Sequence, residues 1–296
     1  MDNQKPLGFI GLGVMGGPMC RNLAQRCGRA VRAYDRVAQP VGAEQASSVG
    51  ALARDCSILF LCLPSGAHVE AVAAEILATT DRALHMIVDM GTSPVAMTRA
   101  MAARMAAEGI TWVDAPIART RQAAEEGTLS VMVGATDNDF ATLQPLLGCM
   151  ASDVTLCGSV GCGQAVKILN NMVLVETVAA LSEALAIGRS VGLDPAVLFD
   201  TLAKGSADSF ALRNHGMKAM LPGMFPERAF SVAYARKDIA YALELAQQGG
   251  VDAAGAARGA ALLDAAREAG WADLYWPVMA KLFERAAGTE TTDGPA

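Results

Sequence analysis

The stretch Gly11-Leu12-Gly13-Val14-Met15-Gly16 decides the fold of the first half of the chain. It follows a short apolar run, Leu7–Ile10, and precedes a helical pattern that extends to Arg26. In such a setting the first glycines of G-x-G-x-x-G allow a tight turn and a close approach to a pyrophosphate, and the third lets the helix pack on the strand. The free N–H groups at the helix start then face the phosphate charge. The stretch therefore predicts a dinucleotide-binding turn.

Outward from this turn, short apolar runs alternate with helical patterns. The runs that we expect to be strands are Leu7–Ile10, Ala30–Tyr34, Ile58–Leu63, Met86–Met90, Thr111–Asp114, Thr128–Val133 and Val154–Cys157. Alanine-rich amphipathic stretches lie between several of them, at Pro18–Arg26, Ala67–Ala78 and Val95–Glu108. This alternation is typical of a parallel sheet that helices cover on both faces. Residues 1–161 are therefore predicted to form an α/β domain, a doubly wound parallel sheet of the Rossmann type.

The pattern changes in the second half, where Gln164–Val191 contains no proline and only one glycine. A helix of this length would extend about 42 Å at 1.5 Å per residue. Because it is apolar on most of its circumference, we expect it to be buried on all sides in an all-helical domain over residues 162–296. It is also expected to contribute to a homodimer or homotetramer interface. Further helical patterns cover Pro195–Ala203, Arg213–Met220, Ala235–Gln248, Ala253–Ala269 and Trp276–Ala287.

Composition excludes several classes of function for these 296 residues, which carry a net charge of −6 with 52% hydrophobic and 18% charged residues. A nucleic-acid-binding protein would be expected to carry a basic stripe, and this sequence has no lysine or arginine block. No uninterrupted apolar run reaches the roughly 18–20 residues of a membrane span. The first residues lack the basic and apolar regions of a signal peptide, so we expect a cytoplasmic protein without membrane or nucleic-acid partners.

Cysteine and histidine do not indicate a metal site. The seven cysteines include no C-x-x-C pair and no histidine at ligand spacing, so we interpret them as small, reduced, buried side chains. The three histidines, His68, His85 and His215, have no evident carboxylate partner in the sequence and are interpreted as structural, with His215 exposed. No metal is therefore expected.

The choice of dinucleotide depends on Asp35 and Arg36, at the end of the expected second strand. Asp35 stands 19 residues after Gly16. A carboxylate at this place accepts hydrogen bonds from the ribose 2′-OH and repels a 2′-phosphate. Arg36 could instead favour the phosphate. The pair favours NAD and leaves NADP open.

Lys167 is the candidate for handling the proton that accompanies hydride transfer. Lys167 and Asn171 are four residues apart and share a helix face, while Asn170 lies on the adjoining face. These polar groups in an apolar helix are costly to bury without partners. Burial would also lower the lysine pKa toward the range that a proton relay requires. The alternative is a lysine that reaches solvent, with the two amides capping a neighbouring loop.

The chain resembles the β-hydroxyacid dehydrogenase family, which includes 3-hydroxyisobutyrate dehydrogenase and tartronate semialdehyde reductase. Five motifs occur in order between residue 7 and about residue 285, namely Gly8–Gly16, Asp114-Ala-Pro116, Gly127–Gly134, Gly163–Asn171 and Lys237-Asp238. The resemblance implies an active site between the two domains, with Lys167 as general acid/base and Asn171 orienting the substrate oxygen. It also implies that Asn170 binds substrate, that Leu63, Pro64 and Thr92 line the cofactor cleft, and that Phe230 and Lys237 close the site.

The sequence departs from the family pattern after Asp114-Ala-Pro116. The family usually carries Ser-Gly-Gly there, which holds the substrate carboxylate, whereas this chain has Ala118-Arg119-Thr120. Arginine presents a planar fork of donors that suits carboxylate, sulfonate or phosphate. A similar Arg-Thr occurs in the sulfolactaldehyde reductase branch, so we expect a small anionic hydroxy acid or aldehyde acid as substrate. The alternative is that Arg119 points to solvent and Ala118 alone reshapes the pocket.

Two other functions remain open from the sequence. Imine reductases share this architecture but usually carry another residue in place of the lysine, so Lys167 argues against that activity. A dinucleotide-binding reader protein without catalysis would be expected to lose the lysine and to carry added basic segments, which this chain lacks.

Overall fold

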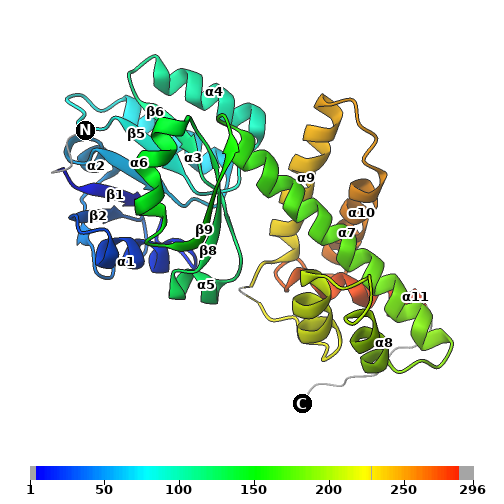
Figure 1. The fold of residues 1–296 in the computed structure, drawn as a ribbon. Helices are drawn as coiled ribbons and strands as arrows, with labels where there is room; N and C mark the ends of the chain where they lie inside the picture. The colour runs from blue at the N-terminus through cyan, green and yellow to red at the C-terminus, as the bar shows by residue number, and fades with distance from the viewer. Residues whose placement is uncertain (1–4, 228, 287–296) are drawn as a thin grey trace. The chain divides into compact units, whose positions relative to one another are not determined.

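The computed structural model describes residues 5–227 and 229–286. The chain splits into two compact units, unit 1 up to Lys167 and unit 2 from Ile168. The long helix that joins them in sequence, α7, spans Cys162–Ser190 and therefore begins in unit 1 and continues into unit 2 (Figure 1). The domain boundary predicted at residue 161 lies immediately before this helix.

Unit 1 contains one mixed sheet. Its strands are β1 (Leu7–Ile10), β2 (Val31–Tyr34), β3 (Glu44–Gln45), β4 (Ile58–Leu61), β5 (Met86–Asp89), β6 (Thr111–Asp114), β7 (Ile117–Ala118), β8 (Leu129–Gly134) and β9 (Ala151–Gly158). The spatial order is β3-β2-β1-β4-β5-β6-β8-β7, with β9 paired to β8. All pairs from β3 to β6 are parallel, whereas β8 runs antiparallel to β6 and β7. The predicted doubly wound α/β fold is confirmed, and the short strands β3 and β7 were not predicted.

Helices cover both faces of this sheet. They are α1 (Gly16–Arg26), α2 (Val49–Asp55), α3 (Gly66–Leu77), α4 (Val95–Ala106), α5 (Arg121–Glu126) and α6 (Asp137–Leu147). Successive side chains of a strand point to opposite faces. Leu7 and Phe9 of β1 pack in one core cluster with residues of α1 and α6. Ile10, from the same strand, packs in a second cluster with residues of α2, α3 and α4.

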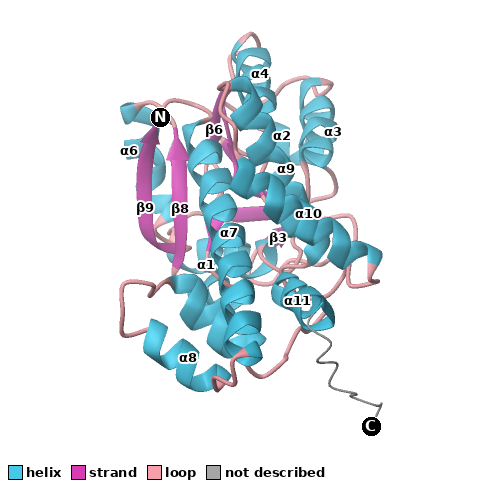
Figure 2. Ribbon diagram, turned by 90° about the vertical axis from the view of Figure 1, so that its right-hand side faces the viewer, coloured by secondary structure: helices cyan, strands magenta, loops and turns pink. Residues whose placement is uncertain are grey.

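Unit 2 is helical. In residues 168–227 and 229–286 the only β pairings are isolated bridges, Glu227 with Leu274 and Ser231 with Tyr275. The helices that follow α7 are α8 (Pro195–Leu202), the π-helix η1 (Leu212–Met220), α9 (Val232–Gln248), α10 (Ala254–Glu268), the 3₁₀ helix η2 (Trp276–Ala280) and α11 (Lys281–Ala286). Figure 2 labels α8, α9, α10 and α11 among them. The second, all-α domain built on a long helix is therefore confirmed.

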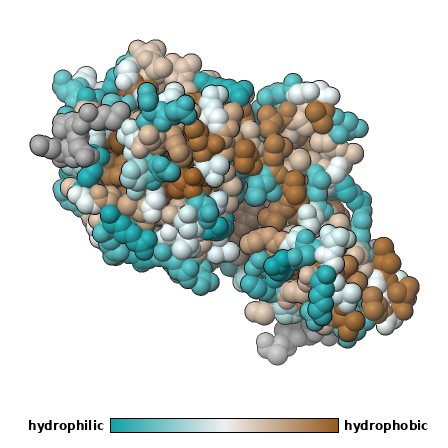
Figure 3. Space-filling view, viewed as in Figure 1, coloured by the Kyte–Doolittle hydropathy of each residue, from teal (hydrophilic) through white to brown (hydrophobic). Residues whose placement is uncertain are grey.

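Helix α7 is buried on one face only, which corrects the expectation of burial on all sides. Val178 and Leu185 lie in the core of unit 2. On the other side, Val173 is 57% exposed and Ile187 is 64% exposed. Figure 3 shows hydrophobic surface in the part of unit 2 where Figure 1 places the end of α7 and α8. By length and composition alone α7 could cross a membrane, a property that core helices of soluble proteins share.

Candidate active site

The glycine turn between β1 and α1 requires glycine at its first and last positions. Gly11 has a φ of +95°, and a Cβ built on it would lie 2.3 Å from the carbonyl oxygen of Cys62. A Cβ on Gly16 would lie 2.0 Å from the carbonyl oxygen of Gly11. Any larger residue would push the turn away from β4 or α1 away from the turn.

The middle of the turn is open. The Cβ position of Gly13 has no atom within 4 Å, so the backbone there can be approached closely from outside. The start of α1 follows directly, where the N–H of Gly17 donates to the carbonyl oxygen of Gly13 at 3.0 Å and Pro18 has no N–H. The turn therefore fits the phosphate groups of a dinucleotide in its shape.

Asp35 organises the glycine turn from the end of β2. Its Oδ2 accepts the N–H of Leu12 at 2.7 Å, and its Oδ1 accepts those of Val37 and Ala38 at 2.8 and 2.9 Å. Burial alone would raise the pKa of Asp35, but these backbone hydrogen bonds outweigh it and hold the pKa below its ordinary value. The neighbouring Arg36 is largely exposed and forms an ion pair with Glu75 at 3.4 Å.

The other predicted cofactor residues follow two further strands of the same sheet. Leu63 and Pro64 follow β4, and Thr92 follows β5. A Cβ on Gly91 would lie 3.0 Å from the carbonyl oxygen of Leu63, so the two loops are in close contact. Because β1, β4 and β5 are adjacent and parallel, the glycine turn and both loops lie at one edge of the sheet, where dinucleotides bind in such folds.

The start of α7 is anchored at the same edge. Asp114, the fully buried last residue of β6, accepts the N–H of Gly161 at 2.7 Å and that of Gln164 at 2.8 Å. Burial raises the pKa of Asp114, and hydrogen bonds from these backbone groups oppose the rise. The carboxylate thus holds the first turn of α7 on the end of β6.

A second link to this turn runs through Gln164, which is also fully buried. Its Oε1 accepts the N–H of Ser93 at 3.0 Å, and its Nε2 donates to the carbonyl oxygen of Gly91 at 2.9 Å. These bonds span the loop that contains Thr92. Lys167 follows three residues later on α7 and is half-buried. Asp114 and Gln164 belong to motifs that are visible in the sequence, but their roles at this turn were not predicted. A carboxylate at the end of an apolar strand was the available signal.

In unit 2, Asn171 is buried and bonded to Asp238 of α9. The Nδ2 of Asn171 donates to Asp238 Oδ2 at 2.5 Å, and Asn170 donates to Asn171 Oδ1 at 3.0 Å. Lys237 Nζ lies 3.3 Å from Asp238 Oδ1, as an ion pair without hydrogen-bond alignment.

Aromatic rings surround this pair on α9. Lys237 Nζ lies 5.5 and 5.4 Å from the ring centroids of Tyr234 and Tyr241. Phe230 is half-buried, and its ring lies 6.5 Å from that of Tyr234. The structure thus groups Asn170 and Asn171 with Asp238, and Phe230 with the aromatic surroundings of Lys237.

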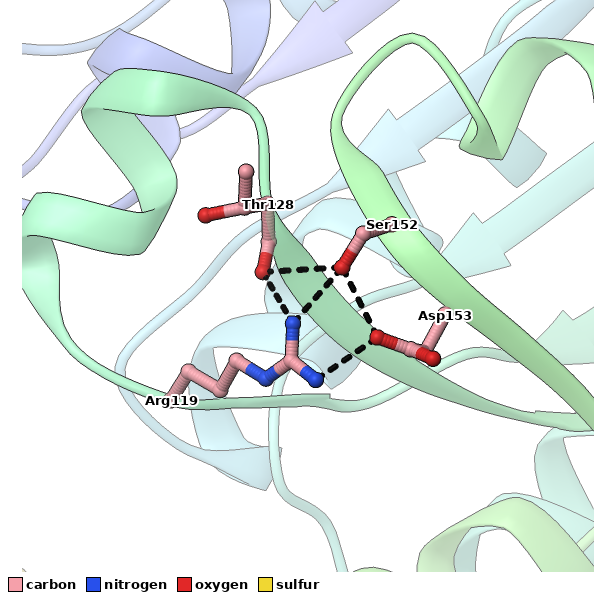
Figure 4. A network of polar contacts seen from close by, with 4 residues as sticks. All are labelled: Arg119, Thr128, Ser152 and Asp153. Carbon is pink, nitrogen blue, oxygen red and sulfur yellow. Dashed lines mark hydrogen bonds and ion pairs between the residues drawn. The ribbon is translucent and has the colours of Figure 1, made fainter.

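Arg119 is held by its own unit. Its Nη1 donates to the carbonyl oxygen of Thr128 at 2.6 Å and to Ser152 Oγ at 2.7 Å, and its Nη2 donates to Asp153 Oδ2 at 2.6 Å (Figure 4). Hydrogen bonds from Ser152 and Arg119 hold the pKa of Asp153 below its usual range. Arg119 has a φ of +85°, a backbone region that favours glycine.

The residues on either side of Arg119 take part in the local secondary structure. Ala118 is the last residue of β7 and pairs with Ser130 of β8. Thr120 caps α5, because its Oγ1 accepts the N–H of Ala123 at 3.4 Å. The side chain of Arg119 therefore extends from the end of β7 across the start of β8 to the start of β9.

The expectation of an exposed His215 is wrong. The side chain is 8% exposed, within the π-helix η1, and its Nδ1 is 2.5 Å from the hydroxyl of Tyr275. Burial lowers its pKa to about 4. The polar neighbours Arg213, Asn214 and Lys218 had indicated solvent, but the helix turns His215 toward Trp276. Within the described ranges, no group of three or more histidine, cysteine or acidic residues could hold a metal ion.

Known families match both parts of the chain. The family model for the NAD binding domain of 6-phosphogluconate dehydrogenase matches residues 6–158. A second model, for the NAD-binding domain of NADP-dependent 3-hydroxyisobutyrate dehydrogenase, matches residues 161–282. The 2-(hydroxymethyl)glutarate dehydrogenase of Eubacterium barkeri is 33% identical over 99% of this chain and 100% of its own length.

This protein belongs to the β-hydroxyacid dehydrogenase family. The 3-hydroxyisobutyrate dehydrogenase of Pseudomonas aeruginosa is 34% identical to this hydroxyacid dehydrogenase over 81% of the chain and 85% of its own length. Among solved structures, the 3-hydroxyisobutyrate dehydrogenase of Mycobacterium tuberculosis has a TM-score of 0.82 at 27% identity, covering 94% of this chain and 99% of that one. The protein is thus an NAD(P)-dependent hydroxyacid dehydrogenase, and the family resemblance inferred from the motifs is confirmed.

Proposed function

We propose that this hydroxyacid dehydrogenase transfers hydride between NAD and a small 3-hydroxy acid or aldehyde acid with an anionic far end, with Lys167 as general acid/base. One observation carries the proposal. The turn of α7 that precedes Lys167 is bonded through Asp114 to the end of β6 and through Gln164 to the loop after β5. This supports a role for Lys167, because the helix turn before it is held at the strand edge where dinucleotides bind in such folds.

The chemistry requires a proton donor and a correctly oriented oxygen. NADH, when bound, supplies the hydride for reduction, and NAD accepts it in the reverse direction. Lys167 gives its proton to the oxygen of the aldehyde during reduction and takes the hydroxyl proton during oxidation, so charge does not build up on that oxygen. Asn171 orients the same oxygen by hydrogen bonding, and Asn170 supports it from the next position on α7.

The preference for NAD over NADP rests on Asp35. Its carboxylate lies at the end of β2, where a ribose 2′-OH is bound in dinucleotide folds and where a 2′-phosphate would meet like charge. Arg36, the residue that could favour NADP, is engaged with Glu75 instead. Dissociation constants measured by NADH and NADPH fluorescence test this preference. We expect NADH to bind at least tenfold more tightly, and equal affinities would contradict the role of Asp35.

The proposal for the anionic far end rests on Arg119. A guanidinium has five N–H donors, and the three hydrogen bonds of Arg119 engage Nη1 and Nη2 only. Among the described residues Nε has no partner. The N–H of Nε and the second N–H of Nη2 can therefore still bind an oxyanion, while Nη1 stays bonded to Ser152 and the first N–H of Nη2 to Asp153. Thr120 supplies a second polar group beside it.

Relatives named for their substrates support a small acid. Their names specify 2-(hydroxymethyl)glutarate, 3-hydroxyisobutyrate and 2-hydroxy-3-oxopropionate. The first of these carries a second carboxylate, which is the kind of group that a guanidinium could bind at the far end. For this chain we propose a carboxylate, sulfonate or phosphate at that position.

The test is NADH consumption by the purified protein with short aldehydes that end in carboxylate, sulfonate or phosphate. We expect turnover, with sulfolactaldehyde or succinic semialdehyde preferred over tartronate and methylmalonate semialdehydes. A preference for the two shorter semialdehydes would remove Arg119 from the substrate site. No turnover with any aldehyde, with NADH binding intact, would contradict the proposed reaction and would direct the search to imines or to a reader role.

Assembly as a homodimer or homotetramer and a cytoplasmic location remain proposals. The exposed apolar residues of α7 supply a reason for association, because large apolar side chains in a row are costly to leave in water. Light scattering after gel filtration should give two or four times the mass of the chain. A monomer would contradict the proposal.

A further inference from the structure

We propose that Asp238 is a positioning residue for catalysis, because its buried carboxylate sets the orientation of the Asn171 amide. The inference rests on the proposed role of Asn171 in orienting the substrate oxygen. Asp238 lies on α9 and Asn171 on α7, 67 positions apart in sequence. Asn171 Nδ2 donates to Asp238 Oδ2 at 2.5 Å, and both side chains are almost fully buried, at 4% and 3% exposed.

The two ends of an amide differ chemically, and a carboxylate distinguishes them. An ionised carboxylate can only accept hydrogen bonds, so it selects the NH₂ end of an asparagine and repels the oxygen end. The neighbouring bond is consistent with this orientation, since Asn170 Nδ2 donates to Asn171 Oδ1 at 3.0 Å. Asp238 and Asn170 therefore hold opposite ends of one amide, and the direction in which Asn171 presents its donor follows from both.

A positively charged group lies next to the Asp238 carboxylate. A buried carboxylate is costly unless an opposite charge and hydrogen bonds accompany it. Lys237, the preceding residue, brings its Nζ to 3.3 Å from Asp238 Oδ1. The same ammonium lies 5.5 Å from the ring centroid of Tyr234 and 5.4 Å from that of Tyr241, within the range of cation–π attraction.

A carboxylate that only joins two helices does not need to be buried. Arg236, on the same helix, bonds Asp264 of α10 through its Nε at 2.9 Å, and that carboxylate is 40% exposed in its side chain. This pair joins α9 to α10 without a buried charge. Asp238 instead is buried and contacts the amide of Asn171. This arrangement is expected if the orientation of that amide matters for function.

The first test replaces Asp238 by asparagine, which keeps shape and volume but lets the amide pair adopt either direction. We expect kcat/KM to fall about 10- to 100-fold through misorientation of the substrate oxygen, mostly in kcat. The thermal midpoint should stay close to wild type, and NADH affinity by fluorescence titration should fall less than in Lys237→Ala, because the ammonium itself is kept. Asp264→Asn is the matched control and should leave kcat/KM within about twofold.

A double-mutant cycle separates positioning from structure. Once Asn171→Ala has removed the amide, adding Asp238→Asn should reduce kcat by less than about twofold further. The same cycle in urea unfolding should show coupling between the two residues, a readout that does not depend on activity. Additive losses in kcat, or an Asp238→Asn enzyme within twofold of wild type, would overturn the inference for Asp238 and leave the proposed function intact. Wild-type turnover by Asn171→Ala would instead overturn the proposed role of Asn171, and this inference with it.

Discussion

The polar residues that mark the candidate site in unit 1 differ in their partners from the two buried pairs of unit 2. In unit 1 the partners are backbone groups: Asp35 accepts three backbone N–H groups, Asp114 accepts two, and Gln164 bonds one N–H and one carbonyl. In unit 2 the partners are side chains, Asn171 with Asp238 and His215 with Tyr275.

The difference determines how each unit responds to change. Every residue except proline carries a backbone N–H, so a carboxylate at the end of a strand finds partners whatever the neighbouring side chains are. A side-chain pair exists only if both positions carry suitable groups. We therefore expect substitutions of Asp35, Asp114 or Gln164 to act through backbone geometry, and those in the Asn171–Asp238 and His215–Tyr275 pairs to act in a coupled way.

The largest expected effect is the loss of turnover when Lys167 of unit 1 is replaced, and the replacement of Lys237 in unit 2 is its comparison. Lys167→Ala should lower kcat by about 10²- to 10⁴-fold, because it removes the proposed general acid/base, and should leave NADH binding nearly unchanged. If Lys237 closes the cofactor site, as the family resemblance implies, Lys237→Ala should mainly weaken NADH binding. Stopped-flow turnover and NADH titration of both variants check this. Near wild-type turnover by Lys167→Ala would remove it from the mechanism.

The next largest effect is expected at Asp114, the carboxylate of unit 1 that accepts two backbone N–H groups. Asp114→Ala leaves buried N–H groups of Gly161 and Gln164 without an acceptor, and should lower the free energy of unfolding by about 3 kcal/mol. Asp264→Ala in unit 2 removes two partly exposed ion pairs, with Arg236 and Arg267, and should cost less than about 1 kcal/mol. Urea unfolding at pH 7 compares the two. Equal losses in the free energy of unfolding for the two variants would contradict the difference that we describe between the two units.

A fall in pH should destabilise unit 2 through the protonation of His215. Burial lowers its pKa from 6.5 to about 4, so protons bind preferentially to the unfolded chain between these values. Stability is therefore full above about pH 6.5 and declines as the pH falls toward 4, by about 2 kcal/mol at pH 5. His215→Gln should reduce this pH dependence in urea unfolding. An unchanged slope in His215→Gln would contradict the assignment.

The smallest expected effect concerns Arg119. Arg119→Gly should raise KM for anionic aldehydes about tenfold with little change in kcat, because the clamp binds ground and transition states alike. Stability should change by less than about 1 kcal/mol, since glycine relieves the strain at φ +85° while the exposed ion pair to Asp153 is lost. Asp153→Asn is the control and should raise KM less. Equal losses for neutral and anionic aldehydes would contradict the clamp.

Much of unit 1 followed from local pattern. The seven predicted strands all occur, with ends shifted by at most three residues, because continuous apolar runs between turn residues are typical of buried strands. The strands β3 and β7 have only two residues each and leave no such pattern. The antiparallel direction of β8 was also not predictable, since an apolar run carries no information about the direction of its neighbour.

The sequence alone determined the turn between β1 and α1, the two-part organisation and the family. A Cβ at Gly11 or Gly16 would collide with nearby backbone, so glycine at those positions is a requirement that can be read locally. Only the tertiary structure decided that Asp238 contacts Asn171, that Arg119 turns to Asp153 and that His215 is buried against Tyr275. These partners lie 67, 34 and 60 positions away in sequence. Contacts between side chains at such separations depend on how whole helices and strands pack, and no local pattern encodes them.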